Sequence, residues 1–313
     1  MAYAQTTEPQ SLMLPFEAWL RNADRSEQTV RAYLGACTRF ARWFEAINRQ
    51  ALSADSMTMT PSDLRLYRES LIAQKLKPTS INAALAALRT LGLFVAEHYG
   101  GANPAAKLPS IELSTQHAPR SLSRQDQFKL HQALDRRRAY AEHHGHALVW
   151  IVRDEAMIQL MLNPGLRVDE VCKLDVDDVI VRERSGSVTV RQGKGLKHRV
   201  VPLNAVVRDA LRSWLTVRRD LDVEDADALF VTKYRERIGS ESVRHLLREI
   251  SRMAGIKATP HTLRHSFAKG LVDAGESLDR VGELLGHSSL DTTRIYTAPT
   301  HADLERAVAR LEN

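Results

Sequence analysis

The chain has 313 residues, a formal net charge of +6 and a pI near 9.4. Its composition predicts an ordinary soluble protein, and its two cysteines exclude a disulfide framework or a cysteine metal site. No apolar run has the length of a membrane span and no secretory signal opens the chain, so we expect a cytoplasmic protein. The positive charge suits a polyanionic partner such as nucleic acid, although many weakly basic proteins have no such partner.

The first hundred residues are expected to form a flexible leader at residues 1–10 and a small helical domain at residues 11–102. Apolar residues recur there at steps of three and four, which is the period of helices with one buried face. The predicted helix boundaries are the cap Ser26, the cap and proline Thr60-Pro61, the proline Pro78 and the glycine Gly100.

Residues 103–120 contain three prolines, a density that resists helix and favours an extended connection, so we place the domain linker there. Residues 121–313 then form a second domain, which is predicted to be mainly α-helical with a small antiparallel sheet. Its predicted strands are residues 176–181, 187–192 and 198–203, the last two joined by a glycine-rich turn. Its predicted helices are residues 121–134, 153–162, 168–174, 260–274, 278–285 and 302–311, with further helix after Asn204.

Residues 136–150 look like an expansion between the first two helices of this domain. They hold three consecutive arginines and the histidines His143, His144 and His146. Three close histidines suggest a metal site, but no cysteine or carboxylate pattern completes one. We therefore expect a solvated loop that faces DNA or a partner.

A phosphate site is predicted at the start of the helix that Thr259-Pro260 opens. His261 and Arg264 lie three residues apart and so share a face, and the start of a helix favours anions. Each residue also has a structural alternative, because Arg264 could cap a surface and His261 could satisfy a hydrogen bond in the core.

Two further cationic residues stand at turns. Arg167 follows the Pro164-Gly165 break and precedes a short helix in which Glu170 could orient it, although a simple surface ion pair is the alternative. Lys194 lies at the tip of the predicted hairpin, where a solvated turn is the alternative and Lys197 competes for any role.

Near the carboxyl end, His287 follows Gly286, the predicted end of a helix, and Tyr296 comes nine residues later. A tyrosine at such a place usually packs by its amphipathic ring. Taken singly, neither residue predicts a function.

Taken in order, these motifs are far more specific. They are Gly165-Leu166-Arg167 with Glu170, Gly193-Lys194-Gly195, His261 with Leu263-Arg264-His265, Leu285-Gly286-His287 and Tyr296. The set resembles the tyrosine recombinase or phage integrase family, and is most similar to its Xer-type and its integron and transposon recombinases. The resemblance covers the whole second domain and, more loosely, the first, which is similar to the family's SAM-like core-binding domain.

The resemblance implies a site-specific recombinase that cleaves and rejoins DNA through a 3′-phosphotyrosine, without metal, ATP or other cofactor. Tyr296 would be the nucleophile and Arg167 and Arg264 would clamp the scissile phosphate. The other implied roles are proton transfer with the nucleophile for His261, a hydrogen bond to the phosphate for His287 and protonation of the leaving 5′ oxygen for Lys194. Pro164 departs from the Thr or Ser usual in the family, which puts the pose of the Arg167 loop in question.

The resemblance also implies the partners: double-stranded DNA with paired inverted repeats, and a homo- or hetero-tetramer assembled on it. The helix at residues 302–311 would dock on a neighbouring subunit, unless its apolar stripe packs on its own domain. Arg244 and Arg248, one turn apart, are candidate DNA contacts, with a solvated helix face as the alternative. The competing functions are a catalytically inactive DNA-binding accessory protein and a relaxing topoisomerase.

Overall fold

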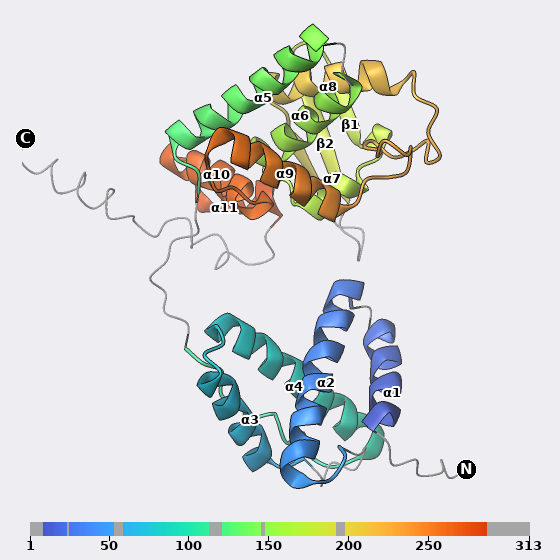
Figure 1. The fold of residues 1–313 in the computed structure, drawn as a ribbon, viewed down its shortest axis with the longest axis vertical. Coiled ribbons are helices and arrows are strands. Elements are labelled where there is room, and N and C mark those ends of the chain that lie inside the picture. Colours follow the sequence, from blue (N-terminus) through green and yellow to red (C-terminus); the bar gives the residue numbers. More distant parts are fainter. Residues whose placement is uncertain are drawn as a thin grey trace, which may run out of the picture. The chain divides into compact units, whose positions relative to one another are not determined.

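The computed structural model describes residues 9–23, 25–52, 59–112, 121–144, 148–191 and 198–286. The chain divides into two compact units, Met1–Thr115 and Gln116–Asn313 (Figure 1). Helices dominate both, and the described residues of the second unit include one three-stranded antiparallel sheet. This confirms the predicted fold class, mainly α with a small antiparallel sheet.

Unit 1 is a four-helix arrangement within the described residues. Local caps set the helix boundaries: the Ser26 hydroxyl accepts a hydrogen bond from Thr29 N at 3.2 Å, and Thr60 and Asp63 form a reciprocal capping box. The boundaries predicted at Ser26, Thr60-Pro61, Pro78 and Gly100 are therefore confirmed. The helices are α1 (Pro9–Asn22), α2 (Glu27–Asn48), α3 (Pro61–Ala73) and α4 (Pro78–Tyr99), so α1 begins inside the segment expected to be a leader.

Helix α4 is the core of unit 1. By length and composition it is apolar enough to cross a membrane, a segment that the sequence was not expected to contain. Its residues Leu85, Leu88 and Leu91 are fully buried, and α4 packs against the other three helices. Because its apolar face is already covered by protein, we interpret α4 as a core helix.

The first part of the predicted linker packs on α4. Ala105 and Leu108 are buried in the core of unit 1, and the Arg89 guanidinium donates to the Leu108 carbonyl oxygen at 2.7 Å. The Asn103 side chain donates to Arg89 O at 3.0 Å and accepts from Ala105 N at 2.9 Å. Residues 103–112 are thus tied down by burial and hydrogen bonds.

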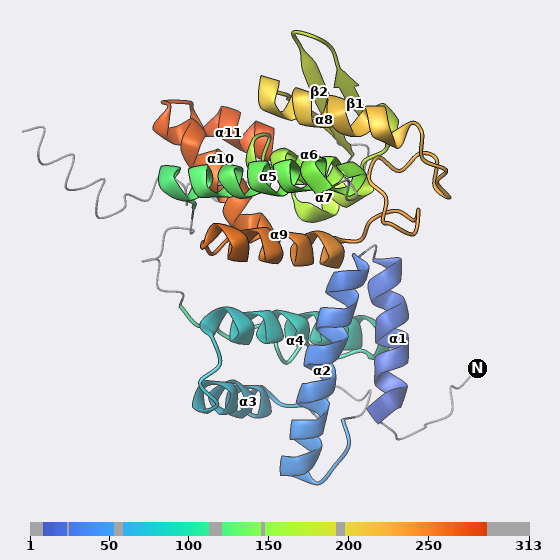
Figure 2. The same cartoon turned by 45° about the horizontal axis from the view of Figure 1, so that its top comes forward.

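Unit 2 is layered (Figure 2). The sheet and α8 lie on one side of a layer formed by α5, α6 and α7, and α9 lies on the other side, while α10 and α11 lie together at one end. Strands β2 and β3 pair with Val188 opposite Val201, which confirms the predicted hairpin strands. The elements are α5 (Arg124–His144), α6 (Leu148–Leu162), α7 (Val168–Lys173), the 3₁₀ turn η1 (Val176–Asp178), β1 (Val179–Val181), β2 (Gly186–Arg191), β3 (His198–Pro202), α8 (Ala205–Arg218), α9 (Ser240–Ala254), α10 (Pro260–Asp273) and α11 (Leu278–Leu285).

Two predictions for unit 2 are wrong in detail. The strand expected at residues 176–181 begins with η1, because the Asp178 carboxylate accepts from Asp175 N at 2.8 Å and closes a turn. The loop expected at residues 136–150 is largely helix, the end of α5 and the start of α6. Ion pairs between these two helices hold it: Arg137 contacts Asp154 at 2.7 Å and Arg138 contacts Glu155 at 3.1 Å.

We predict that Gly92→Ala destabilises unit 1. A Cβ at this position would lie 2.1 Å from Asn103 Oδ1, so the side chain that anchors residues 103–112 must move and lose its hydrogen bonds. The expected net loss is about 1 kcal/mol in urea unfolding, since the helix-propensity gain of alanine offsets part of the cost. Gly35→Ala is the matched control: its nearest neighbour is Arg39 Nη1 at 3.5 Å, so it should be neutral or stabilising. Equal behaviour of the two variants would contradict this account of residues 103–112.

Candidate active site

The loop that carries Arg167 depends on Gly165. This glycine has φ +69°, and an added Cβ would lie 2.4 Å from Phe267 Cδ1 and 3.2 Å from Leu285 Cδ2. Only glycine therefore allows the loop after α6 to approach α10 and the end of α11 this closely. The loop ends where Arg167 begins α7.

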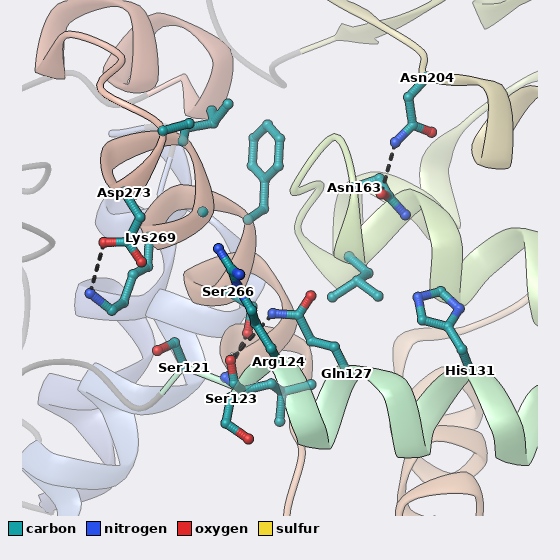
Figure 3. Close-up of a pocket in the computed structure, with 16 residues that line it drawn as sticks. Ser121, Ser123, Arg124, Gln127, His131, Asn163, Asn204, Ser266, Lys269 and Asp273 are labelled. Carbon is teal, nitrogen blue, oxygen red and sulfur yellow. Dashed lines mark hydrogen bonds and ion pairs between the residues drawn. The ribbon is translucent and has the colours of Figure 1, made fainter.

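Hydrogen bonds between polar side chains support the same loop. It contains Pro164 at the position where the family resemblance led us to expect Thr or Ser. Asn163 Nδ2 donates to Gln159 Oε1 at 2.7 Å. Figure 3 shows the next bond, in which Asn204 Nδ2 donates to Asn163 Oδ1 at 2.9 Å. Gln159 is itself buried and lies 3.4 Å from the Nδ1 atom of His131. The end of α6 is thus joined to α5 and to the cap of α8 by side chains that the sequence did not single out.

Arg264 joins three segments of unit 2. Thr259 caps α10 as predicted, and the Arg264 side chain is 5% exposed. Its Nη1 donates to Gly165 O and its Nη2 to Leu285 O, both at 2.6 Å. The alternative of a surface cap is therefore wrong: Arg264 is a buried cation fixed between the Arg167 loop and the end of α11.

The carboxylate of Glu170 lies at the centre of the site. It accepts hydrogen bonds from Arg167 N at 2.8 Å and Arg167 Nη1 at 2.9 Å, and it lies 4.0 Å from Arg264 Nη1. The predicted pairing of Arg167 with Glu170 is present, and Arg264, which comes from a different element, lies near the same carboxylate. The Arg167 side chain is 40% exposed, whereas that of Glu170 is only 13% exposed, so this is no ordinary surface ion pair.

A third guanidinium, Arg199 on β3, also contacts Glu170. Its Nη1 and Nη2 donate to the two carboxylate oxygens at 3.0 and 2.7 Å, and its Nε donates to Leu284 O at 2.9 Å. Burial alone would raise the pKa of Glu170, but the hydrogen bonds and charges of Arg199 and then Arg167 outweigh it and lower that pKa. Glu170 is therefore ionised at neutral pH.

The sequence analysis did not select Arg199 as a site residue, although the alternation of its strand could have indicated it. In a strand, residues two apart share a face, so Arg199, Val201 and Leu203 point the same way. Val201 and Leu203 are buried, and Arg199 pairs with the buried Val190 across the hairpin. An arginine on the inward face of a strand needs a buried acidic or carbonyl partner.

The two histidines of α10 lie in different environments. His261 is exposed, which removes the alternative of a core hydrogen bond, and its ring centroid is 6.4 Å from that of His265. Burial, followed by the charges of His261 and Arg264, lowers the pKa of His265 from 6.5 to about 4. His265 is therefore neutral at physiological pH.

Three predicted site residues, Lys194, His287 and Tyr296, lie outside the described residues, as does the predicted helix at 302–311. The described elements that flank them are β2 and β3 on either side of Lys194, and α11, which ends at Leu285 just before His287. Both β3 and α11 are tied to Glu170 or Arg264. The roles of Lys194, His287 and Tyr296 remain predictions.

The two candidate DNA contacts on α9 pair with acidic residues of the chain. The Arg244 side chain is 35% exposed, donates to Ser240 Oγ at 2.9 Å and lies 4.0 Å from Asp169. The more exposed Arg248 contacts Glu241 at 2.9 Å. A role in binding DNA stays a prediction for both.

A pocket of about 1200 Å³ lies beside the site (Figure 3). It is lined by the start of α5, the end of α6 and the second half of α10, and its lining includes Asn163 and Phe267 but neither Arg167 nor Arg264. Across it, the Ser266 hydroxyl accepts from Leu122 N at 2.7 Å and joins α10 to the segment before α5.

Within the described ranges, no three or more His, Cys, Asp or Glu side chains form a group that could hold a metal ion. The cysteines do not offer a nucleophile either. Cys37 and Cys172 are buried, and burial raises the pKa of each thiol to about 12.

The comparisons with known proteins cover both units. Residues 146–303 match the model of the phage integrase family, and residues 16–97 match that of the phage integrase N-terminal SAM-like domain. The chain is 31% identical over 304 residues to tyrosine recombinase XerA of Pyrococcus furiosus, covering 95% of this chain and 94% of that protein.

Two solved structures show a similar fold. XerH site-specific recombinase in a post-cleavage complex with a palindromic difH substrate has a TM-score of 0.72 and 23% identity, covering 91% of this chain and 80% of that one. A lambda integrase tetramer bound to a Holliday junction has a TM-score of 0.60 and 19% identity, covering 91% and 78%.

We predict that Gly165→Ala disrupts the site. The new methyl group would overlap Phe267 and the backbone has a positive φ, so unit 2 should lose about 1–3 kcal/mol of stability. Urea unfolding followed by tryptophan fluorescence, to which Trp150 and Trp214 contribute in unit 2, measures the loss. Gly270→Ala on α10 meets no atom within 4 Å and should cost nothing. A neutral Gly165→Ala would show that the loop does not require glycine.

We predict that His265 makes unit 2 sensitive to acid. Its pKa is about 4 in the folded protein and ordinarily 6.5, so the unfolded chain binds more protons between these values. Stability should therefore be fully present above pH 6.5 and fall as the pH drops towards 4, and His265→Gln should lessen that fall in thermal unfolding. The exposed His245 on α9 is the control for His→Gln. Identical pH profiles for wild type and His265→Gln would contradict this role.

Proposed function

The chain belongs to the phage integrase family and is a tyrosine-type site-specific recombinase; on this premise we propose that Tyr296 is its nucleophile and Arg167 and Arg264 its phosphate clamp. The proposal rests on one observation. Arg167 and Arg264 are far apart in the sequence, yet both lie at the carboxylate of Glu170. A pair of guanidinium groups on one fixed frame suits the non-bridging oxygens of a phosphodiester.

The chemistry explains the remaining residue types. A tyrosine hydroxyl has a pKa near 10, so its attack needs positive charge nearby and a group that accepts its proton, here the exposed His261. Tyr296 Oη forms a bond to phosphorus, the bond from phosphorus to the 5′ oxygen breaks, and Lys194 supplies the proton that this oxygen takes. His287 donates a hydrogen bond to the phosphate.

The rejoining step reverses these events. A 5′ hydroxyl attacks the phosphotyrosine, a new phosphodiester forms and the tyrosine regains its proton. Because the phosphotyrosine conserves the energy of the broken diester, no ATP is consumed. When the attacking hydroxyl comes from a second DNA site, strands are exchanged.

Homologous recombinases bind DNA as multimers, and the lambda integrase tetramer on a Holliday junction is one such complex. For this chain we propose two subunits on each inverted-repeat site and a tetramer on two sites. The segment at residues 302–311 joins neighbouring subunits, and Arg244 and Arg248 exchange their acidic partners for DNA. The reaction takes place in the cytoplasm.

The covalent step is tested with a nicked site that traps the adduct. Because only the hydroxyl of Tyr296 can form the ester, Tyr296→Phe should abolish the protein–DNA adduct on a denaturing gel while site binding in a mobility-shift assay stays within a few-fold. Tyr234→Phe is the control, since Tyr234 is 69% exposed in the segment before α9.

Loss of binding along with the adduct would make Tyr296 a structural residue. A wild-type chain that binds the site and forms no adduct would instead be the inactive accessory protein. An adduct that only relaxes supercoils, with no exchange between two sites, would indicate a topoisomerase.

A further inference from the structure

Arg199 donates hydrogen bonds through all three nitrogens of its guanidinium group, although it lies outside the residues given roles above. Its side chain is 9% exposed. It forms a two-pronged contact with Glu170 and a third hydrogen bond, through Nε, to the Leu284 carbonyl oxygen. A planar fork of five N–H donors is needed to reach three acceptors on two elements. Lysine, with one nitrogen, cannot hold the same arrangement.

The contacts of Glu170 show what Arg199 prevents. Its two carboxylate oxygens accept four hydrogen bonds, two from Arg167 and two from Arg199, and a carboxylate offers about four lone pairs. The Nη1 atom of Arg264 is 4.0 Å from the same carboxylate, outside hydrogen-bond distance. Without Arg199, two acceptor positions would open next to a buried guanidinium.

The charges of the site lead to the same conclusion, that Glu170 would compete for Arg264 if Arg199 were absent. Three guanidinium groups surround one carboxylate, which leaves a net charge of +2 among these four residues. A phosphodiester carries one negative charge, and the five-coordinate transition state carries two. Removal of Arg199 would lower the local net charge to +1 and let a nearly buried anion compete with the phosphate for Arg264.

We propose that Arg199 is a positioning residue for strand cleavage: it occupies Glu170 so that Arg167 and Arg264 keep their charge for the scissile phosphate. Through Leu284 O it also ties the end of α11 to α7, which contains Glu170. The inference rests on the proposed function, because it assumes that these two arginines hold the phosphate. Arg199 does not touch DNA itself.

The test compares two nicked substrates, one with a normal scissile phosphate and one with a methylphosphonate. The methyl group replaces a non-bridging oxygen and removes its charge, so cleavage then depends less on the arginine pair. Arg199→Met should form adduct about 10- to 100-fold more slowly than wild type on phosphate, the range typical when a residue that orients a catalytic group is lost. On methylphosphonate the deficit should shrink to within about 3-fold, because the charge that needed the clamp is absent.

Two further variants keep the test decisive. Arg199→Lys retains the charge without the fork and should cleave faster than Arg199→Met. Arg237→Met is the matched control: Arg237 contacts Asp175 at 2.6 Å, Asp225 at 2.8 Å and Leu174 O at 3.1 Å in the same unit, but not Glu170. It should show equal deficits on the two substrates, if any. Circular dichroism and site binding verify that each variant is folded.

The outcomes are separable. Equal deficits for Arg199→Met on both substrates, or none on phosphate, would overturn the positioning role. If Arg199→Met fails to fold, Arg199→Lys carries the comparison, and a deficit of Arg199→Lys that is the same on both substrates would overturn the role too. Absence of adduct from wild type on both substrates would instead contradict the proposed function.

Discussion

A carboxylate withdrawn from water must be compensated by cations, and in unit 2 this requirement organises the site. Glu170 is 13% exposed, and the cost of burying its charge is several kcal/mol before compensation. Its partners come from the Arg167 loop and from β3, with the Arg264 side chain of α10 nearby. Compensating one anion thus fixes the mutual positions of Arg167 and Arg199, with Arg264 4.0 Å away.

Hydrogen bonds to backbone carbonyl oxygens also fix the position of an arginine in the site. Arg264 would be an expensive buried cation if it did not donate to the carbonyl oxygens of Gly165 and Leu285. Those bonds require the close approach that only a glycine at position 165 permits. The glycine, the two carbonyls and the carboxylate therefore form one interdependent frame, and the segment that contains His287 and Tyr296 follows directly after it. We infer that the frame is built before DNA binds and supplies preorganised charge to the reaction.

Much of the fold was predictable because its signals are local. Ser26, Thr60 and Thr259 cap helices through hydrogen bonds to residues three positions away, and the pattern of the hairpin strands is set by alternation. The end of α5 was not predictable in this way. Its arginines and histidines show no apolar period, and its partners Asp154 and Glu155 lie on another helix.

The candidate site was likewise predictable only where its signals lie in the sequence itself. The order and spacing of Arg167, Arg264 and the later His and Tyr motifs identified the family, which the comparisons bear out. Sequence order could not show that both arginines meet at Glu170, because that contact depends on how four separate elements pack. Arg199 could have been suspected from its inward strand position, but its partner could only be found in three dimensions.

The central claim is that the frame of Glu170 and the Gly165 and Leu285 carbonyl oxygens holds Arg167 and Arg264 ready for one phosphate. The most direct measurement is a crystal structure of the chain trapped on a nicked recombination site. The account predicts that the phosphorus bonded to Tyr296 has its non-bridging oxygens within hydrogen-bond distance of both guanidinium groups, while Glu170 keeps its bonds to Arg167 and Arg199. A phosphate bound away from these two arginines, or a Glu170 that has released Arg199 to pair with Arg264, would contradict it.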